Sequence, residues 1–259
     1  MNLLEKSLPA AEPKLKSLKA WNWSMAILHS VQGVIMLTLS SDFTLLVTSA
    51  FLKFDPATQS LNPVLETLTT WPLGPMIAGF LFLSAFFHMI NALGFSRYTR
   101  NLMRGINPSR WIEYSLSSSL MIVVIAMLVG IYDIVALLCI FFLNAMMILF
   151  GWMMELHNQT TTKTNWTAFW FGCIAGIVPW IGVGIYLFGT PSNPPTFVYW
   201  IYLSMFIFFN IFAINMVWQY KQVGKWRDYL YGERAYMILS LVAKSLLAWQ
   251  VFAGTLRPV

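Results

Sequence analysis

The chain contains seven long apolar segments with few or no charges, and these constrain its fold more than any other feature. A helix of about 20 residues spans the roughly 30 Å hydrocarbon core of a bilayer, so each segment is long enough to cross it. Inside lipid the backbone satisfies its hydrogen bonds only in helices or closed barrels, and these segments lack the alternation of barrel strands. The sequence therefore predicts an all-α membrane protein, a seven-transmembrane-helix bundle. The helices are expected at Trp21–Leu39, Leu73–Phe95, Trp111–Val129, Ile134–Met154, Trp166–Phe188, Phe197–Tyr220 and Ala235–Leu256.

The composition supports an integral membrane protein. Of 259 residues, 58% are hydrophobic and only 10% are charged, whereas a soluble domain carries about 25% charged residues. We expect one seven-helix domain over residues 1–259, with the lipid bilayer as its environment. Cys139 and Cys173 lie in apolar segments and are predicted to be packing residues. No Cys/His metal spacing or phosphate-binding glycine motif occurs, so no metal site is predicted.

The distribution of basic residues predicts the orientation and explains the net charge of +6 without a nucleic-acid partner. Thirteen of the 16 Lys and Arg residues lie on one side of the predicted helices, four of them in segment 1–20 and four in the connection 97–110. Because cytoplasmic loops are enriched in Lys and Arg, we expect the N-terminus in the cytoplasm and the C-terminus outside the cell membrane. The four arginines of 97–110 are interpreted as topology determinants beside anionic lipid.

The connection 40–72 is the one long loop and is expected on the extracellular side. Thr44–Thr48 and Ala50–Phe54 are candidate short strands, so the loop is a possible β-hairpin. A loop of this length is usually functional or structured. A hairpin that forms a lid or an oligomer contact is favoured over disorder, because the loop carries the apolar anchors Phe51, Phe54 and Trp71.

The last apolar segment contains a single charged residue, Lys244, near its midpoint. Lys244 lies ten residues after Arg234 and therefore about 15 Å deep. A charge at this depth costs about 2.5–3.5 kcal/mol on insertion scales. Two interpretations follow: a lysine that snorkels or pairs structurally, or a buried amine held for chemistry, such as a Schiff base with a carbonyl ligand.

Glu113 is the only carboxylate well inside an apolar segment, and it is the expected partner of Lys244. Asn107 and Pro108 form a predicted N-cap and first-turn pair, which puts Glu113 about 8 Å into its helix. Lys244 lies about 7 Å deeper, and its stem reaches back toward the helix N-terminus. An ion pair is therefore predicted, and a purely structural pair remains the alternative.

Other polar and aromatic side chains inside the segments have weaker interpretations. Ser84 and His88 share one helix face, and with His29 they serve either packing or a water network. Ser117, Ser118, Ser119 and Asn144 suit bonds between helices. Ser240 lies one turn before Lys244, so its hydroxyl can reach the amine. The candidate walls for a flat apolar ligand, which are equally suited to interface anchoring or packing, are Trp170, Trp180, Phe209 and Trp249.

Five local sequences resemble the heliorhodopsin family of retinal-binding proteins. They are WIEYSLSSS at Trp111–Ser119, NAMMILFGW at Asn144–Trp152, FWFGCIAGIVPW at Phe169–Trp180, GERAY at Gly232–Tyr236 and SLVAKS at Ser240–Ser245. The resemblance extends from the second predicted helix to the seventh, while the first helix and the long loop agree in layout only. The inverted orientation of that family, with its N-terminus inside, matches the orientation expected from the basic residues.

The resemblance implies a covalently bound all-trans retinal on Lys244 as a protonated Schiff base, with Glu113 as its counterion and Ser240 beside it. It implies that Met147, Ile148, Trp170, Trp180, Phe209 and Trp249 contact the retinal. It also implies a polar cavity lined by His29, Ser84, His88, Asn144 and Tyr114. The implied partners are a second copy of the chain in a homodimer and an unidentified cytoplasmic signalling protein.

Three classes of function were weighed. A light-sensing retinal protein with a slow photocycle is favoured, and it is not an enzyme. A light-driven pump is disfavoured, because the helices at Trp111–Val129, Trp166–Phe188 and Phe197–Tyr220 carry no second buried acid to act as donor or acceptor. A light-gated or leaky proton-conducting rhodopsin remains the alternative. A carrier or enzyme with a buried Lys–Glu pair has no supporting motif.

Overall fold

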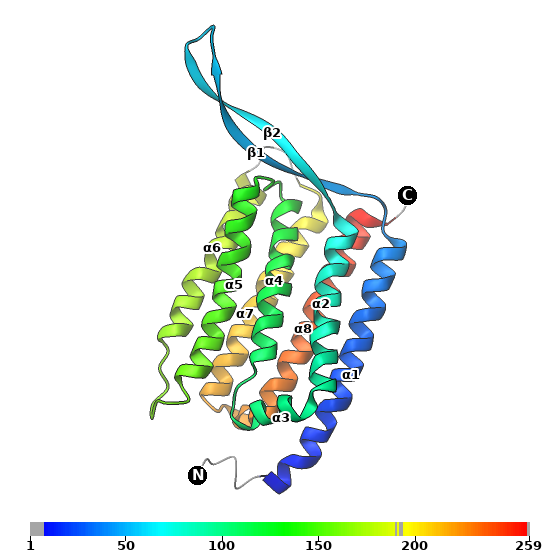
Figure 1. Cartoon of the computed structure of the whole chain (residues 1–259), viewed down its shortest axis with the longest axis vertical. Helices are drawn as coiled ribbons and strands as arrows, with labels where there is room; N and C mark the ends of the chain where they lie inside the picture. The colour runs from blue at the N-terminus through cyan, green and yellow to red at the C-terminus, as the bar shows by residue number, and fades with distance from the viewer. Residues whose placement is uncertain (1–7, 190, 192–193, 258–259) are drawn as a thin grey trace.

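The computed structural model describes residues 8–189, 191 and 194–257, with side chains from residue 15 onward. Within these ranges the chain forms a bundle of long helices with a β-hairpin projecting from one end (Figure 1). Lys6, one of the four basic residues in segment 1–20, lies outside the described residues. The elements in chain order are α1 Leu8–Leu39, β1 Thr44–Asp55, β2 Ser60–Pro72, α2 Leu73–Leu93, α3 Phe95–Met103, α4 Pro108–Leu128, α5 Ile134–His157, α6 Thr167–Gly189, α7 Thr196–Tyr220, a 3₁₀ turn Gly224–Arg227, α8 Tyr229–Val251 and a π-helical turn Phe252–Leu256.

Six of the described helices, α2 and α4 to α8, are long and apolar enough to cross a membrane. The chain is therefore a helical integral membrane protein with several spans. The helix α1 lies beside α2 along the bundle but is not one of these six. Its polar residues Asn22, His29 and Gln32 lower its mean hydropathy.

The predicted ends of two helices are wrong by more than three residues. The helix α1 begins at Leu8 instead of Trp21, and α8 begins at Tyr229 instead of Ala235. Both helices include polar residues before the apolar segment, which a hydropathy criterion leaves out. Outside the bilayer a helix does not have to be apolar, because it is sufficient that its backbone hydrogen bonds are formed. The side chain of Asp228 caps α8 by accepting a hydrogen bond from Leu230 N at 3.0 Å.

The segment that follows α2 also differs from the prediction. Residues Phe95–Met103, taken as part of a connection, form the short helix α3 at the base of the bundle (Figure 1). The predicted cap of α4 is confirmed, since the side chain of Asn107 accepts a hydrogen bond from Arg110 N at 3.2 Å and Pro108 occupies the first turn.

The predicted hairpin is present, but its strands were divided wrongly. Both candidate strands belong to β1, which pairs antiparallel with β2 from Thr44↔Pro72 to Asp55↔Ser60. The chain turns at residues 56–59, where Asp55 accepts hydrogen bonds from Ala57 N and the Thr58 hydroxyl, both at 2.9 Å. These bonds hold the pKa of Asp55 below its usual value, with the Ala57 bond as the larger cause.

Backbone hydrogen bonds fasten the base of the hairpin to the bundle. Thr48 N donates to Tyr132 O at 2.9 Å, just before α5, and Leu73 N donates to Phe43 O at 3.0 Å at the start of α2. Ser41 N donates to Leu256 O at 2.7 Å, which joins the end of α1 to the turn after α8.

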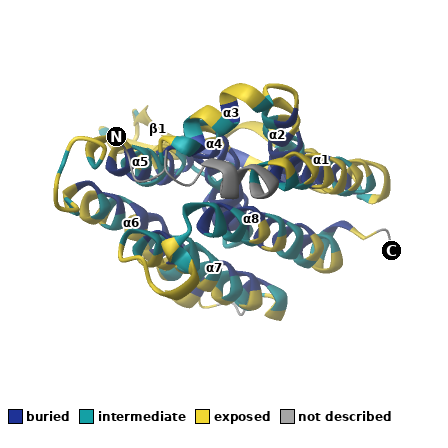
Figure 2. Cartoon of the chain, turned by 90° about the horizontal axis from the view of Figure 1, so that it is seen from below, coloured by how far each residue is buried: buried dark blue, intermediate teal, exposed yellow. Residues whose placement is uncertain are grey.

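The centre of the bundle is α4. The most apolar 18-residue stretch of α4 is 72% buried, whereas the corresponding stretches of the other five candidate spans are 17–39% buried. Seen along the bundle, the buried faces of the helices point inward and their exposed faces point outward (Figure 2). Residues on α4 are therefore the best placed in the chain to meet side chains of α2, α5 and α8.

Candidate functional site

Lys244 of α8 and Glu113 of α4 form a buried ion pair at the middle of the bundle. Lys244 Nζ lies 2.8 Å from Glu113 Oε1, and the two residues are 3% and 4% exposed. Lys244 Nζ also donates to Ser240 Oγ at 2.7 Å, one turn earlier on α8. The hydroxyl of Ser84, on α2, donates to Glu113 Oε1 at 2.6 Å. The expected pairing between these helices is thus present, and two hydroxyls fix its geometry.

The two intramembrane histidines lie next to this pair without touching it. His88 Nδ1 and Asn22 Oδ1 are 2.9 Å apart, and the His88 ring stacks on the His29 ring with a centroid distance of 5.9 Å. Both ring nitrogens of His29 are buried without a hydrogen-bond partner among the described residues. The α1–α2 side of the ion pair is therefore polar but incompletely paired within the protein.

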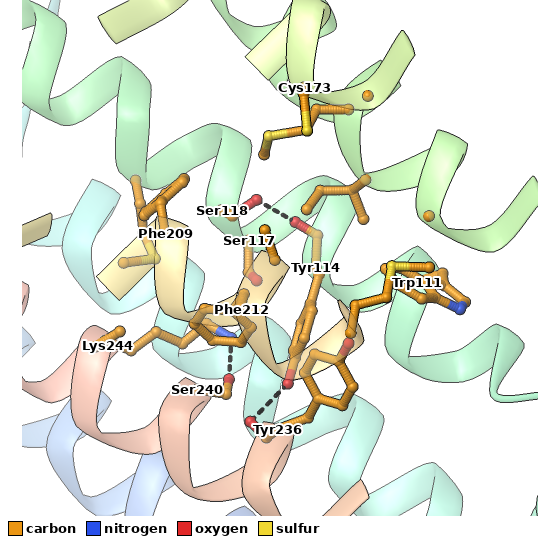
Figure 3. Close-up of a pocket in the computed structure, with 18 of the residues that line it drawn as sticks. Trp111, Tyr114, Ser117, Ser118, Cys173, Phe209, Phe212, Tyr236, Ser240 and Lys244 are labelled. Atoms are coloured by element: carbon orange, nitrogen blue, oxygen red, sulfur yellow. Dashed lines mark hydrogen bonds between the residues drawn. The ribbon is translucent and has the colours of Figure 1, made fainter. Parts of the chain in front are cut away.

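An apolar cavity begins at Lys244 and extends between α4, α5, α6, α7 and α8 (Figure 3). About 120 Å³ of it is open to the centre of a water molecule. Six of the predicted residues line it, namely Lys244, Ser240, Tyr114, Met147, Ile148 and Phe209. The rest of the wall consists of small residues together with aromatic and methionine side chains, namely Trp111, Met121, Phe169, Phe212, Met216 and Tyr236. Lys244 is the only charged side chain among the described lining residues.

Several predicted wall residues do not reach this cavity. Trp170 and Trp249 are 62% and 40% exposed, because the rotation of α6 and α8 turns them outward. The prediction that they contact a ligand there is not supported by this placement. Trp180 is buried, but it packs behind the wall, with its ring centroid 5.3 Å from that of Phe209. Asn144, which was predicted for the polar cavity, lines neither cavity and donates to Ser118 Oγ at 2.8 Å.

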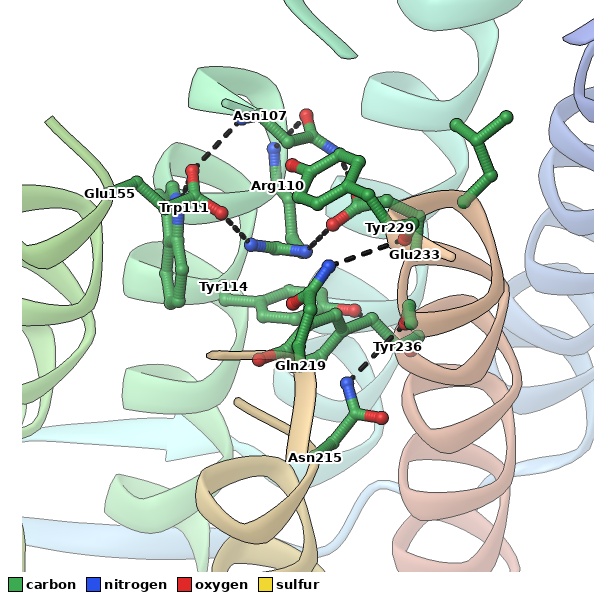
Figure 4. Close-up of polar contacts among 12 residues, drawn as sticks. Asn107, Arg110, Trp111, Tyr114, Glu155, Asn215, Gln219, Tyr229, Glu233 and Tyr236 are labelled. Carbon is green, nitrogen blue, oxygen red and sulfur yellow. Dashed lines mark hydrogen bonds and ion pairs between the residues drawn. The ribbon is translucent and has the colours of Figure 1, made fainter. Parts of the chain in front are cut away.

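A second buried charge cluster, centred on Arg110, was missed by the sequence analysis (Figure 4). Arg110 Nη2 lies 2.5 Å from Glu155 Oε1, and Arg110 Nη1 forms an ion pair with Glu233 Oε1. Asn107 Nδ2 donates to Glu233 Oε2 at 2.7 Å, and Trp111 Nε1 donates to Glu155 Oε2 at 2.6 Å. The cluster joins the ends of α4, α5 and α8.

This cluster corrects two statements about the sequence. Arg110 was assigned to a basic connection, and Glu155 and Glu233 lie just outside the predicted apolar segments Ile134–Met154 and Ala235–Leu256, yet all three side chains are at most 5% exposed. The reason is mutual neutralisation, since oppositely charged groups that pair with one another can be buried at a helix end. Glu113 is therefore one of three buried carboxylates among the described residues.

The rings of Trp111 and Tyr236 connect the Arg110 cluster to the apolar cavity. The guanidinium carbon of Arg110 lies 4.4 Å from the Trp111 ring centroid and 4.0 Å from that of Tyr236. Both rings also line the cavity. Tyr114, the third residue of this wall, donates its hydroxyl to Tyr236 O at 2.9 Å.

A small polar cavity lies on the other side of this wall. Its lining includes Glu113, His88, Asn107, Arg110 and Glu233, and about 20 Å³ is open to the centre of a water molecule. That volume is large enough for one water molecule. The polar cavity thus extends from the Lys244–Glu113 pair toward the Arg110 cluster.

The fold and the site together define a helical membrane protein with a buried lysine at the end of an apolar, aromatic cavity and a carboxylate beside that lysine. The sequence matches the family model described as Heliorhodopsin over residues 18–256, so the chain belongs to the heliorhodopsin family. A comparison with curated proteins gave no match. Membership makes the chain a relative of retinal-based, light-sensing rhodopsins, and retinal is the chromophore that the family implies.

The cavity fits that chromophore by its chemistry. Retinal is a long apolar aldehyde, so it needs an apolar channel with an amine at one end. The cavity offers aromatic and methionine walls, and Lys244 supplies the amine. Glycines at two wall positions let the helices around the cavity approach closely, since a Cβ on Gly151 would lie 2.5 Å from the Trp111 ring and one on Gly172 would lie 3.2 Å from Met147 O.

Proposed function

We propose that this protein is a light sensor in which Lys244 carries all-trans retinal as a protonated Schiff base and Glu113 is the counterion. The observation that carries the proposal is the Lys244 amine at the end of the apolar cavity, 2.8 Å from Glu113. When bound, retinal would supply the absorption of visible light and a change of shape. Lys244 would hold it, Phe209, Phe212 and Met147 would orient it, and Glu113 would hold the positive charge.

The topology forms part of the same proposal. We infer that α1 crosses the membrane as a seventh span, because it packs along α2 over the length of the bundle. The α3 end would face the cytoplasm, where Arg97, Arg100, Lys221 and Lys225 lie. Residues 1–259 would then form one domain with an extracellular C-terminus, and the homodimer and cytoplasmic partner remain predictions.

Active pumping is not part of the proposal. A pump needs acceptor and donor groups on both sides of the attachment site. In the part of the chain that the structure describes, the buried acids other than Glu113 are Glu155 and Glu233, and both are held by Arg110. A leaky proton conductor is the second candidate, favoured by the polar cavity that extends from Glu113 toward Glu233.

The attachment site can be tested by reducing the retinal-loaded protein with borohydride and mapping the retinyl adduct by peptide mass spectrometry. Condensation of the Lys244 amine with the aldehyde releases water, and hydride reduction then fixes the bond. We expect the adduct on Lys244 alone, with Lys225→Ala as a matched control that still forms it. An adduct elsewhere, or a covalent pigment in Lys244→Ala, would refute the assignment.

The transport alternatives are separated by recording pH in suspensions of illuminated cells. We expect no sustained proton flux. A light-dependent pH change that a protonophore abolishes would establish pumping. A current that follows the applied voltage during illumination would favour the proton conductor.

A further inference from the structure

The short helix α3 carries a stripe of three exposed arginines. Arg97, Arg100 and Arg104 are spaced three and four residues apart, with Arg104 immediately after the last helical residue, so they lie on one face. All three side chains are exposed. Lys19 of α1 lies at the start of this helix, with its Nζ 5.8 Å from the Phe95 ring centroid.

The opposite face of α3 is held by the bundle. Tyr98 and Leu102 are buried in a cluster with Leu18 of α1 and Met237 of α8, and Phe95 packs against the same cluster. The helix lies across the base of the bundle, directly after the apolar helix α2 ends at Leu93 (Figure 1). The apolar face is therefore already used, and the arginine face points away from the protein.

The arginines have no carboxylate partner within the described residues. The buried acids at this end, Glu155 and Glu233, are bonded to Arg110. Asp228, a part-buried carboxylate at the same end of the bundle, caps α8. A stripe of cations with no carboxylate partner among the described side chains, at the level where a membrane helix ends, lies where lipid phosphates lie.

We propose that the α3 stripe, Arg97, Arg100 and Arg104, binds the phosphate groups of anionic lipids. Guanidinium groups bind phosphate with paired hydrogen bonds, and a basic residue near an anionic surface raises affinity about fivefold. A protein partner is disfavoured because its interface would need apolar or aromatic anchors, and α3 has buried its own against the bundle. The proposal depends neither on the light response nor on the orientation.

The test uses the purified full chain in detergent micelles with equal amounts of phosphatidylglycerol and phosphatidylcholine, and native mass spectrometry counts the retained lipids. The variant combines Arg97→Gln, Arg100→Gln and Arg104→Gln. The matched control combines Lys163→Gln, Lys221→Gln and Lys225→Gln, which removes the same charge from exposed loops at the same end. Micelles expose both ends of the bundle, so orientation does not affect the result.

We expect the natural chain and the control to retain phosphatidylglycerol preferentially, and the α3 variant to lose this preference by about fivefold per arginine. Equal retention by the α3 variant and the control would overturn the proposal. Displacement of the lipid by an equal concentration of inorganic phosphate would assign the site to free phosphate instead and overturn the lipid assignment. If the triple variant does not fold, Arg100→Gln alone gives the same comparison, and an unchanged preference there is equally decisive.

Discussion

Removing the Arg110 guanidinium should destabilise the bundle more than any change to an exposed cation. Arg110→Gln leaves the carboxylates of Glu155 and Glu233, whose side chains are 3% and 1% exposed, without their shared counterion. Breaking a buried ion pair from one side costs about 3–5 kcal/mol. At about 2–4 °C per kcal/mol for a chain of this size, the melting temperature should fall by about 6–20 °C.

The assay is thermal unfolding in detergent, followed by intrinsic tryptophan fluorescence without added retinal. The control is Lys163→Gln, an exposed loop change that should stay within about 0.5 kcal/mol. Combining Arg110→Met with Glu155→Gln and Glu233→Gln should recover most of the loss, because the unpaired charges are then gone. If Arg110→Gln unfolds at the temperature of the control, the cluster does not join the helix ends as described.

Three further predictions follow from other contacts. In the retinal-loaded protein, Glu113→Gln should shift the absorption maximum to longer wavelength. The reason is that the carboxylate stabilises the positive charge of the Schiff base more in the ground state, where it is localised, than in the excited state, where it is delocalised. The control Glu66→Gln, on the hairpin, should leave the absorption maximum unchanged. Gly151→Ala should cost about 1–3 kcal/mol in thermal unfolding, since its Cβ would overlap the Trp111 ring, whereas Gly182→Ala has no atom within 4 Å and should be tolerated. Asp133→Ala should cost about 0.5–2 kcal/mol in the same assay by removing the cap that accepts hydrogen bonds from Val135 N and Ala136 N.

The apolar segments predicted most of the fold, because hydropathy records where a helix lies in lipid. It does not record where a helix continues into water, and this is why the starts of α1 and α8 were missed. Those starts depend on caps such as Asp228 and on packing outside the membrane. The strands of the hairpin were divided wrongly because the actual turn, around Asp55 and Gln59, lies beyond both candidate strands.

At the site, depth along two helices was enough to predict that Lys244 meets Glu113. To predict which side chains line the cavity, the rotation of each helix about its own axis is needed as well. Without it, Trp170 was assigned to the cavity wall, whereas its side chain is exposed on the outside of the bundle. A periodic pattern could have corrected this. On α6 itself, Phe169, Gly172 and Cys173 line the cavity with the spacing of one helix face, and Trp170 lies outside that face.

The Arg110 cluster could not be predicted from segment composition. Arg110, Glu155 and Glu233 lie near the ends of three different helices, where charges are ordinarily solvated. Only the three-dimensional arrangement shows that they meet, since their burial depends on one another.

The base of the hairpin makes the bundle mechanically asymmetric. Three short backbone bonds, donated by Ser41, Thr48 and Leu73, tie the hairpin-side ends of α1, α2, α5 and α8 to one another. At the opposite end the corresponding ties run through the side chains around Arg110. The two ends of the bundle are therefore held by different kinds of bond, main-chain hydrogen bonds at the hairpin end and a buried charge cluster at the α3 end, so acid or high salt should loosen the α3 end first.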